Sequence, residues 1–203
     1  MESQGRSGMS RGLIAALGSN ALTFVGHYTL YTDVAVLLLR SGASASTTGP
    51  ILLIFGALAL VGIWLTGPQI DRHPRHSALA VLSVLGLGML AAGLSSPILG
   101  LVILAGVVWN AAFGAVPALF QAAAVRTRAT SPELAGAWVN ATSNLGIAAG
   151  AAIGALILDR FELPGLTIVA TTFVVLAIAT VAAARGTFPT AAQRVDIGSG
   201  EGS

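Results

Sequence analysis

Residues 49–95 read GPILLIFGALALVGIWLTGPQI, then DRHPRH, then SALAVLSVLGLGMLAAGLS. All of the formal charge in this stretch falls in the six-residue segment 71–76 between two apolar runs. A helix of roughly 20 residues crosses the hydrocarbon core of a bilayer, which is about 30 Å thick. The stretch therefore predicts two membrane-crossing helices joined by a short polar turn.

Apolar runs of this length recur along the whole chain. We predict six spans at residues 12–39, 49–70, 77–95, 98–124, 133–158 and 164–184. The connections between them are too short to hold another domain. The predicted fold class is all-α, a polytopic bundle of six transmembrane helices over residues 11–185. Gly- and Ser-rich composition predicts disordered polar tails at 1–10 and 186–203.

Composition supports a membrane protein and excludes several other classes. Charged residues make up 9% of the chain, against about 25% in soluble domains, and the mean hydropathy is +0.84. The absence of cysteine excludes disulfides, thiolate metal sites and cysteine nucleophiles. No cluster of arginines is large enough for a nucleic-acid site, and we expect no metal and no cofactor.

The positions of the arginines predict how the chain is oriented across the membrane. A cytoplasmic N-terminus places eight arginines inside: Arg6, Arg11, Arg72, Arg75, Arg126, Arg128, Arg185 and Arg194. Only Arg40 and Arg160 then lie outside, in agreement with the positive-inside rule. We therefore expect both termini to be cytoplasmic, in a plasma or inner membrane.

Polar side chains form stripes on three of the predicted spans. In lipid such residues face the bundle interior or a water-filled cavity. The candidate substrate-cavity residues are Asn20, Thr23, His27 and Tyr31 on the first span, Asn110 and Gln121 on the fourth, and Asn140 and Asn144 on the fifth. For any single residue, hydrogen bonding between helices is the simpler interpretation, but three aligned stripes together favour a cavity. The third and sixth spans carry only Ser and Thr, so we expect them to be outer, lipid-facing supports.

Two titratable residues are candidates for proton coupling. Asp33 is the only acidic residue well inside a predicted span, and His27 lies mid-membrane on the polar stripe of the same span. The alternative for Asp33 is an ion pair or water contact at the external end. The alternative for His27 is a neutral structural role.

A second pattern on the fifth span concerns packing. Gly146, Gly150 and Gly154 are spaced by four residues. Small residues at this spacing let two membrane helices approach closely, so we predict a helix-packing ridge.

The loop at Gly67 to His76 resembles a signature of the major facilitator superfamily, G-x-L-A-D-R-x-G-R-[RK], in the copy after the second helix of each six-helix half. The matching residues are Gly67, Asp71, Arg72 and Arg75, and the departures are Gln69, Pro74 and His76. In the family this loop latches the cytoplasmic ends of the two halves, so the matching residues are a candidate cytoplasmic gate motif. A plain cytoplasmic turn explains the two arginines equally well.

Further segments resemble bacterial drug and sugar efflux permeases of this superfamily. Residues 27–32 resemble their seventh helix, with departures at Asp33 and Val36, while 109–121 resemble the tenth and 140–159 the eleventh. The resemblance implies the C-terminal half of such a transporter, built from two inverted three-helix repeats. It implies that helices one, two, four and five line the cavity and helices three and six lie outside. It also implies a small organic substrate, exchanged for protons.

The implied partners are the lipid bilayer, the substrate, protons, and either an N-terminal six-helix half or a second copy of this chain. One alternative is a half-size protein that acts only with such a partner and does not transport alone. A remote alternative is an intramembrane serine hydrolase, which needs a serine paired with a histidine. Ser19 lies two turns from His27, beyond hydrogen-bond reach, so we do not expect an enzyme.

Overall fold

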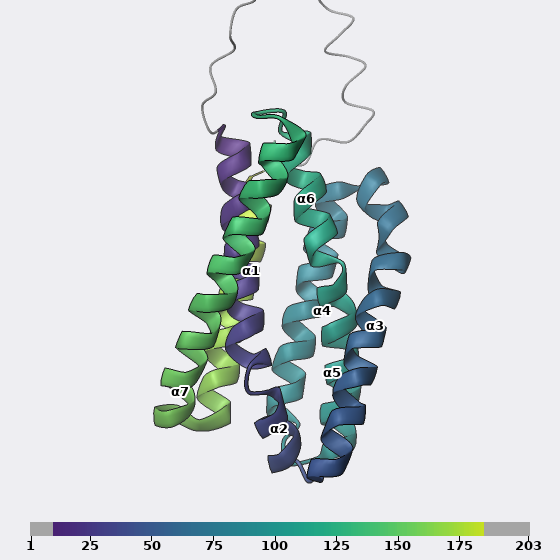
Figure 1. Ribbon diagram of the computed structural model, residues 1–203, viewed down its shortest axis with the longest axis vertical. Helices are drawn as coiled ribbons and strands as arrows, with labels where there is room; N and C mark the ends of the chain where they lie inside the picture. Colours follow the sequence, from purple (N-terminus) through teal and green to yellow (C-terminus); the bar gives the residue numbers. More distant parts are fainter. Residues whose placement is uncertain (1–9, 185–203) are drawn as a thin grey trace, which may run out of the picture.

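The computed structural model describes residues 10–184, which form α-helices and contain no β-strand (Figure 1). The helices are α1 (Arg11–Tyr31), α2 (Val34–Arg40), α3 (Ala45–Arg72), α4 (Pro74–Leu94), α5 (Leu99–Gly114), α6 (Val116–Arg126) and α7 (Pro132–Ala183). The predicted all-α class is confirmed. The tail predictions for 1–9 and 186–203 lie outside the described residues, as do Arg6, Arg185 and Arg194.

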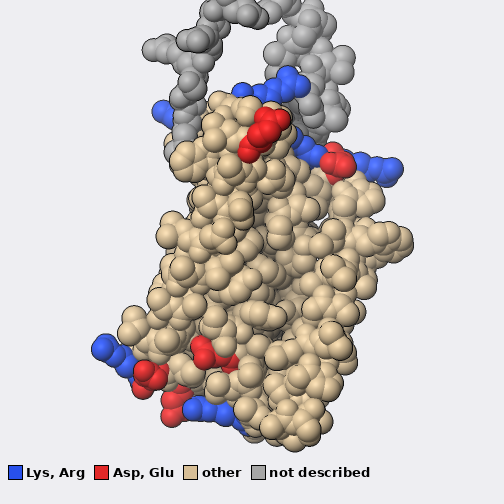
Figure 2. Space-filling model, viewed as in Figure 1, with Lys and Arg blue, Asp and Glu red and all other residues tan. Residues whose placement is uncertain are grey.

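Five segments are long and apolar enough to cross a membrane. They are Arg11–Arg40, α3, α4, Leu99–Arg126 and α7. Charged side chains gather at the two ends of the bundle and leave a broad uncharged belt across the middle of the face in Figure 2. Length, composition and this distribution of charge agree with a membrane protein.

Two of the predicted spans are interrupted helices, which corrects their boundaries. The predicted helix 12–39 breaks at Thr32 and Asp33, between α1 and α2. The Thr32 hydroxyl donates to the Tyr28 carbonyl at 2.8 Å, a local bond of the kind that competes with helix continuation. The predicted helix 98–124 breaks at Ala115, since Pro117 has no N–H to donate to the Phe113 carbonyl.

The predicted fifth and sixth spans are joined in α7. An unbroken helix of its 52 residues would be about 78 Å long, more than twice a bilayer core. Glu162, with φ 56° and ψ −167°, interrupts the helix. The chain reverses there, and the two arms run side by side in opposite directions (Figure 1). We call 132–161 the first arm and 163–183 the second arm. The predicted loop 159–163 is thus a turn centred on one residue.

The glycine ridge of the first arm lies directly against α1. A Cβ atom on Gly150 would be 2.6 Å from the Val25 carbonyl oxygen, and one on Gly154 would be 2.6 Å from that of Thr29. A Cβ on Gly146 would meet the Phe24 Cβ at the same distance. The helix backbones therefore touch without intervening side chains.

Helix α4 differs from the outer support that we predicted. In the most apolar 18-residue stretch of α4, half of the residues are buried against other helices of the chain. In the corresponding stretch of α3, only 22% are buried. Gly88 lets the backbone of Trp109 approach, and Gly86 accommodates Val174. In the single chain α4 is therefore an inner helix and α3 is the most exposed one, so this prediction is wrong for the chain by itself.

Candidate functional site

The predicted cavity residues fall into two groups in the structure. Asn20, Thr23, His27 and Asn110 are buried between helices, and Tyr31 is half-buried. Gln121, Asn140 and Asn144 are exposed on the surface of the single chain. The structure therefore does not bring all eight residues to one open cavity.

Asn20 joins α1 to the first arm of α7. Its Nδ2 lies 3.1 Å from the Val139 carbonyl and 2.9 Å from each of the Thr142 and Ser143 hydroxyl oxygens. Such interhelical bonds contribute about 0.6–2 kcal/mol each in membrane proteins. In this arrangement Asn20 holds two helices together.

Thr23 and Asn110 bond to their own helices. The Thr23 hydroxyl donates to the Ser19 carbonyl at 2.7 Å, and the Asn110 Nδ2 donates to the Gly106 carbonyl at 2.8 Å. These bonds satisfy the side chains within the helix and leave only part of their polar capacity for other groups.

His27 is at the centre of a buried aromatic cluster. The Trp109 Nε1–H donates to His27 Nδ1 at 3.0 Å, and the Phe113 ring stacks on the imidazole at a centroid distance of 3.4 Å. Tyr31 stacks on it at 4.9 Å. Because the indole can only donate, Nδ1 carries no proton and the neutral ring is protonated at Nε2. Any proton added at Nδ1 must break the bond to Trp109.

Sequence reasoning had not singled out Trp109 and Phe113 as partners of His27. The only sequence feature that pointed to this pair is their spacing of four residues, which places both rings on one face of α5. Tyr28 and Tyr31 flank the histidine on α1 in a similar way. Only the packing of α1 against α5 brings the two sets together.

The three exposed amides form one polar surface, which we call the amide strip: Gln121, Asn140 and Asn144. The Asn144 Nδ2 lies 3.4 Å from the Asn140 Oδ1. The Gln121 amide lies over Gly136, where an added Cβ would be 2.7 Å from Nε2. Gly136 is one turn from Asn140, so the strip continues from α6 along one face of the first arm.

Asp33 lies at the junction of α1 and α2, not inside a continuous helix. It is half-buried, and its carboxylate is 3.4 Å from the Thr32 hydroxyl. A Cβ atom on Gly154 would lie 3.3 Å from the same carboxylate. Within the described residues no hydrogen bond joins Asp33 to His27, so the two proton-coupling candidates occupy separate places.

The loop residues make contacts with other helices. Arg126 donates to the Asp71 carboxylate at 2.7 Å and to the Ile70 carbonyl at 2.9 Å. Arg75 donates to the Ala182 carbonyl at 2.8 Å. Both acceptor carbonyls are in the last turn of a helix, where no intrahelical donor remains. Sequence reasoning had not identified Arg126 as the partner of Asp71.

The other two residues of the candidate gate motif, Gly67 and Arg72, make no side-chain hydrogen bond to another helix in the described part of the chain. Gly67 has open space where a Cβ atom would lie, and Arg72 is exposed. The motif therefore divides into two residues with structural bonds and two without.

Within residues 10–184 no group of three or more His, Asp or Glu side chains is arranged to hold a metal ion. A comparison with known protein families finds none that matches this sequence.

Proposed function

We propose that this chain is one half of a secondary transporter of the major facilitator type, corresponding to the C-terminal half. It would export small organic molecules in exchange for protons, by alternating access against a partner half. The observation that carries the proposal is the amide strip of Gln121, Asn140 and Asn144, three amides exposed together on a largely apolar bundle.

Amide side chains are costly to leave against lipid tails, because hydrocarbon offers no hydrogen-bond partners. The first arm is buried against α1 through Gly146 and Gly150 on another face. The amide strip therefore needs water, substrate or a second membrane protein opposite it. A cavity between two halves supplies all three.

The reversal at Glu162 supports a count of six crossings. If the two arms of α7 cross separately, they add to the four other long segments and return both ends of the bundle to the same side. Arg11, Arg72, Arg75, Arg126 and Arg128 then share that side. We propose that it is cytoplasmic, since only Arg40 and Arg160 lie at the opposite end.

The contacts of Asp71 and Arg75 support a role for this loop in holding the cytoplasmic end. Arg126 ties the end of α3 to α6, and Arg75 ties the start of α4 to the end of α7. Opening that end requires these helices to move as one body or these bonds to break.

A half-size protein that works only with a partner is the second candidate. The exposed amide strip favours it, because a single chain leaves the strip uncovered. A serine hydrolase has less support, since His27 Nδ1 is already occupied by Trp109 and no serine donates to that histidine in the described part of the chain.

Flux into proteoliposomes under an imposed pH gradient tests the proposal. The chain alone, two copies joined in tandem, and a tandem carrying Asn140→Leu and Asn144→Leu would be compared over a panel of cationic dyes and labelled sugars. We expect flux in the tandem that collapses when the gradient is dissipated, and that falls at least about tenfold in the double variant. Leu145→Ile in the same arm is the matched control and should transport normally.

Flux by the single chain at the tandem's rate would exclude a requirement for a separate N-terminal half, since free copies of the chain can pair in the membrane. Binding without flux in every arrangement, including co-reconstitution with candidate N-terminal halves, would contradict transport.

A further inference from the structure

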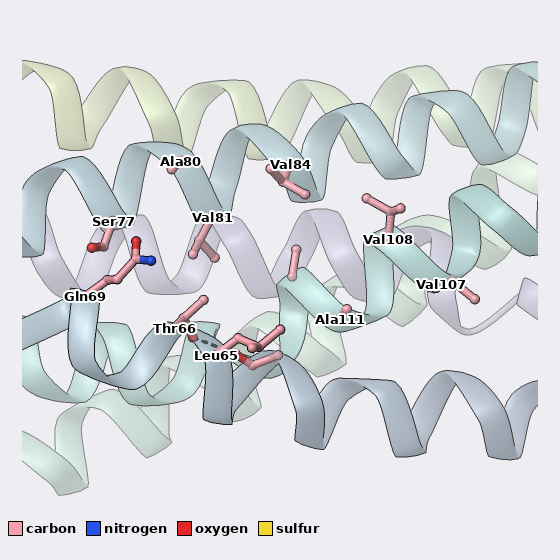
Figure 3. A pocket seen from close by; sticks show the side chains of 12 residues that line it. Leu65, Thr66, Gln69, Ser77, Ala80, Val81, Val84, Val107, Val108 and Ala111 are labelled. Carbon is pink, nitrogen blue, oxygen red and sulfur yellow. Dashed lines mark hydrogen bonds between the residues drawn. The ribbon is translucent and has the colours of Figure 1, made fainter.

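A groove of about 400 Å³ runs between α3, α4 and α5 (Figure 3). None of the predicted substrate-cavity residues lines it. Its walls are apolar, formed by residues such as Leu65, Val81, Val84, Val107 and Val108. This volume is in the range of small-ligand sites. The volume and the apolar walls suit a short length of hydrocarbon chain.

The polar groups of the groove are concentrated at one end. Gln69 of α3 and Ser77 of α4 extend toward each other there, as Figure 3 shows. Thr66, one turn earlier on α3, already donates its hydroxyl to the Gly62 carbonyl at 2.7 Å. Gln69 and Ser77 are thus the free hydrogen-bonding groups that an occupant would meet.

Positive charge lies directly beyond this polar end. Arg72 is one turn after Gln69, on the same face of α3 as Leu65 and Gln69. It is exposed, while the neighbouring Asp71 is bound to Arg126 and so partly neutralised. An anionic group above Gln69 would therefore meet a net positive surface.

A second groove extends the first toward the opposite end of the bundle. It lies between α4 and α5, has a volume of about 350 Å³, and shares Val108 with the first. Apart from Ser95 at its far end, its lining is apolar. The two grooves together form an apolar track along α4 and α5 with one polar, positive terminus.

We propose that this track holds an acyl chain of an anionic phospholipid from the leaflet at the Arg72 end. The phosphate would lie at Arg72, and the ester oxygens would accept from the Gln69 amide and the Ser77 hydroxyl. Basic groups beside grooves between membrane helices recognise anionic headgroups in this way. The inference rests on the chain being embedded in a bilayer and does not depend on transport.

A photoactivatable lipid tests the position of the chain. The full chain would be placed in nanodiscs containing phosphatidylglycerol with a diazirine near the end of one acyl chain. We expect crosslinks concentrated on α4 and α5 around Val84 and Val108. Even labelling of all exposed apolar residues, including Leu53 and Trp64 of α3, would overturn the proposal.

Filling the groove provides a variant test. Ala80→Phe places a ring in the groove from α4, and Ala57→Phe places one on an exposed part of α3 outside it. The first should lose the concentrated labelling, while the second should keep it. Equal labelling in the two variants would contradict a lipid site.

The headgroup preference is measured separately by native mass spectrometry from nanodiscs with equal phosphatidylglycerol and phosphatidylcholine. Arg72→Gln should lower the preference for retained phosphatidylglycerol about fivefold. Arg11→Gln removes another exposed arginine from the same end of the bundle and should leave the preference unchanged. An unchanged preference in Arg72→Gln would refute the proposed headgroup contact.

Discussion

At the scale of single residues, the contact between α1 and α7 depends on the absence of side chains. The ridge of Gly146, Gly150 and Gly154 brings the backbones of two helices together. Elsewhere on α1, Asn20 bonds to the first arm of α7 and His27 bonds to Trp109 of α5. His27 is two residues from both Val25 and Thr29, so the close backbone approach to α7 and the bond to α5 act on different faces of α1.

Gly150→Ala should destabilise the bundle. The added methyl group would lie 2.6 Å from the Val25 carbonyl oxygen, so the helices must separate. We expect a loss of about 1–3 kcal/mol in the free energy of unfolding, measured by denaturation in detergent. Gly18→Ala is the matched control, since no atom of another helix lies within 4 Å of its added Cβ. Equal stability of the two variants would argue against the close contact.

The bond between Trp109 and His27 can be measured with a double-mutant cycle. His27→Phe and Trp109→Phe each keep an aromatic ring in the cluster and remove the bond. We expect a coupling energy of about 0.6–1.7 kcal/mol in the unfolding free energy. Purely additive effects would show that the bond does not contribute.

The sequence alone identified which residues are important in this contact better than it identified what each residue contacts. Spacing alone identified the glycine ridge, because it needs only one helix. The partners of Asn20 and His27 come from segments about 80 to 120 residues away. No local pattern shows whether an amide faces a neighbouring helix or a cavity, and so both interpretations stayed open.

At the scale of elements, the helix ends determine how the chain reverses direction. The turn at 71–76 was readable from its charge and Pro74, and α3 and α4 follow the predicted runs closely. The break at Thr32 was missed because no glycine or proline marks it. The turn at Glu162 is shorter than predicted because one residue adopts a left-handed backbone conformation.

Replacing Glu162 tests that turn. Its φ of 56° and ψ of −167° lie near a region that only glycine adopts without strain. Glu162→Gly should therefore stabilise the bundle by up to about 1 kcal/mol, despite losing the exposed contact to Arg40 at 3.8 Å. Glu162→Val should be destabilising, because a branched side chain is disfavoured at positive φ. Thermal unfolding in detergent would rank the three proteins, and the opposite order would exclude this turn geometry.

The loop contacts give a second prediction at this scale. Arg126 bonds both to Asp71 and to the end of α3, and its side chain is 14% exposed, against 78% for Asp71. Arg126→Gln should cost about 1.5–3 kcal/mol of unfolding free energy, and Asp71→Asn no more than about 1 kcal/mol. Arg128→Gln provides the control for loss of a nearby exposed arginine. Equal losses for Arg126 and Asp71 would mean that the carbonyl contact is unimportant.

At the scale of the whole molecule, the bundle has an apolar surface interrupted by the amide strip. Composition and span length predicted the apolar surface directly. Which polar residues stay exposed depends on how all the helices pack, and this could not be read from single spans. The inner position of α4 was missed for the same reason, since Gly86 and Gly88 matter only once Val174 and Trp109 are opposite them.

Water access at the amide strip is the most direct test of the proposed half-transporter. The chain has no cysteine, so Asn144→Cys introduces a unique thiol. Leu145→Cys is the matched control, because Leu145 is its neighbour in the first arm and is 66% exposed. Each variant in membrane vesicles would be treated with a membrane-impermeant thiol reagent. If the strip lines a water-filled cavity, Asn144→Cys reacts and Leu145→Cys does not; equal reaction at both positions, or none at Asn144→Cys, would contradict it.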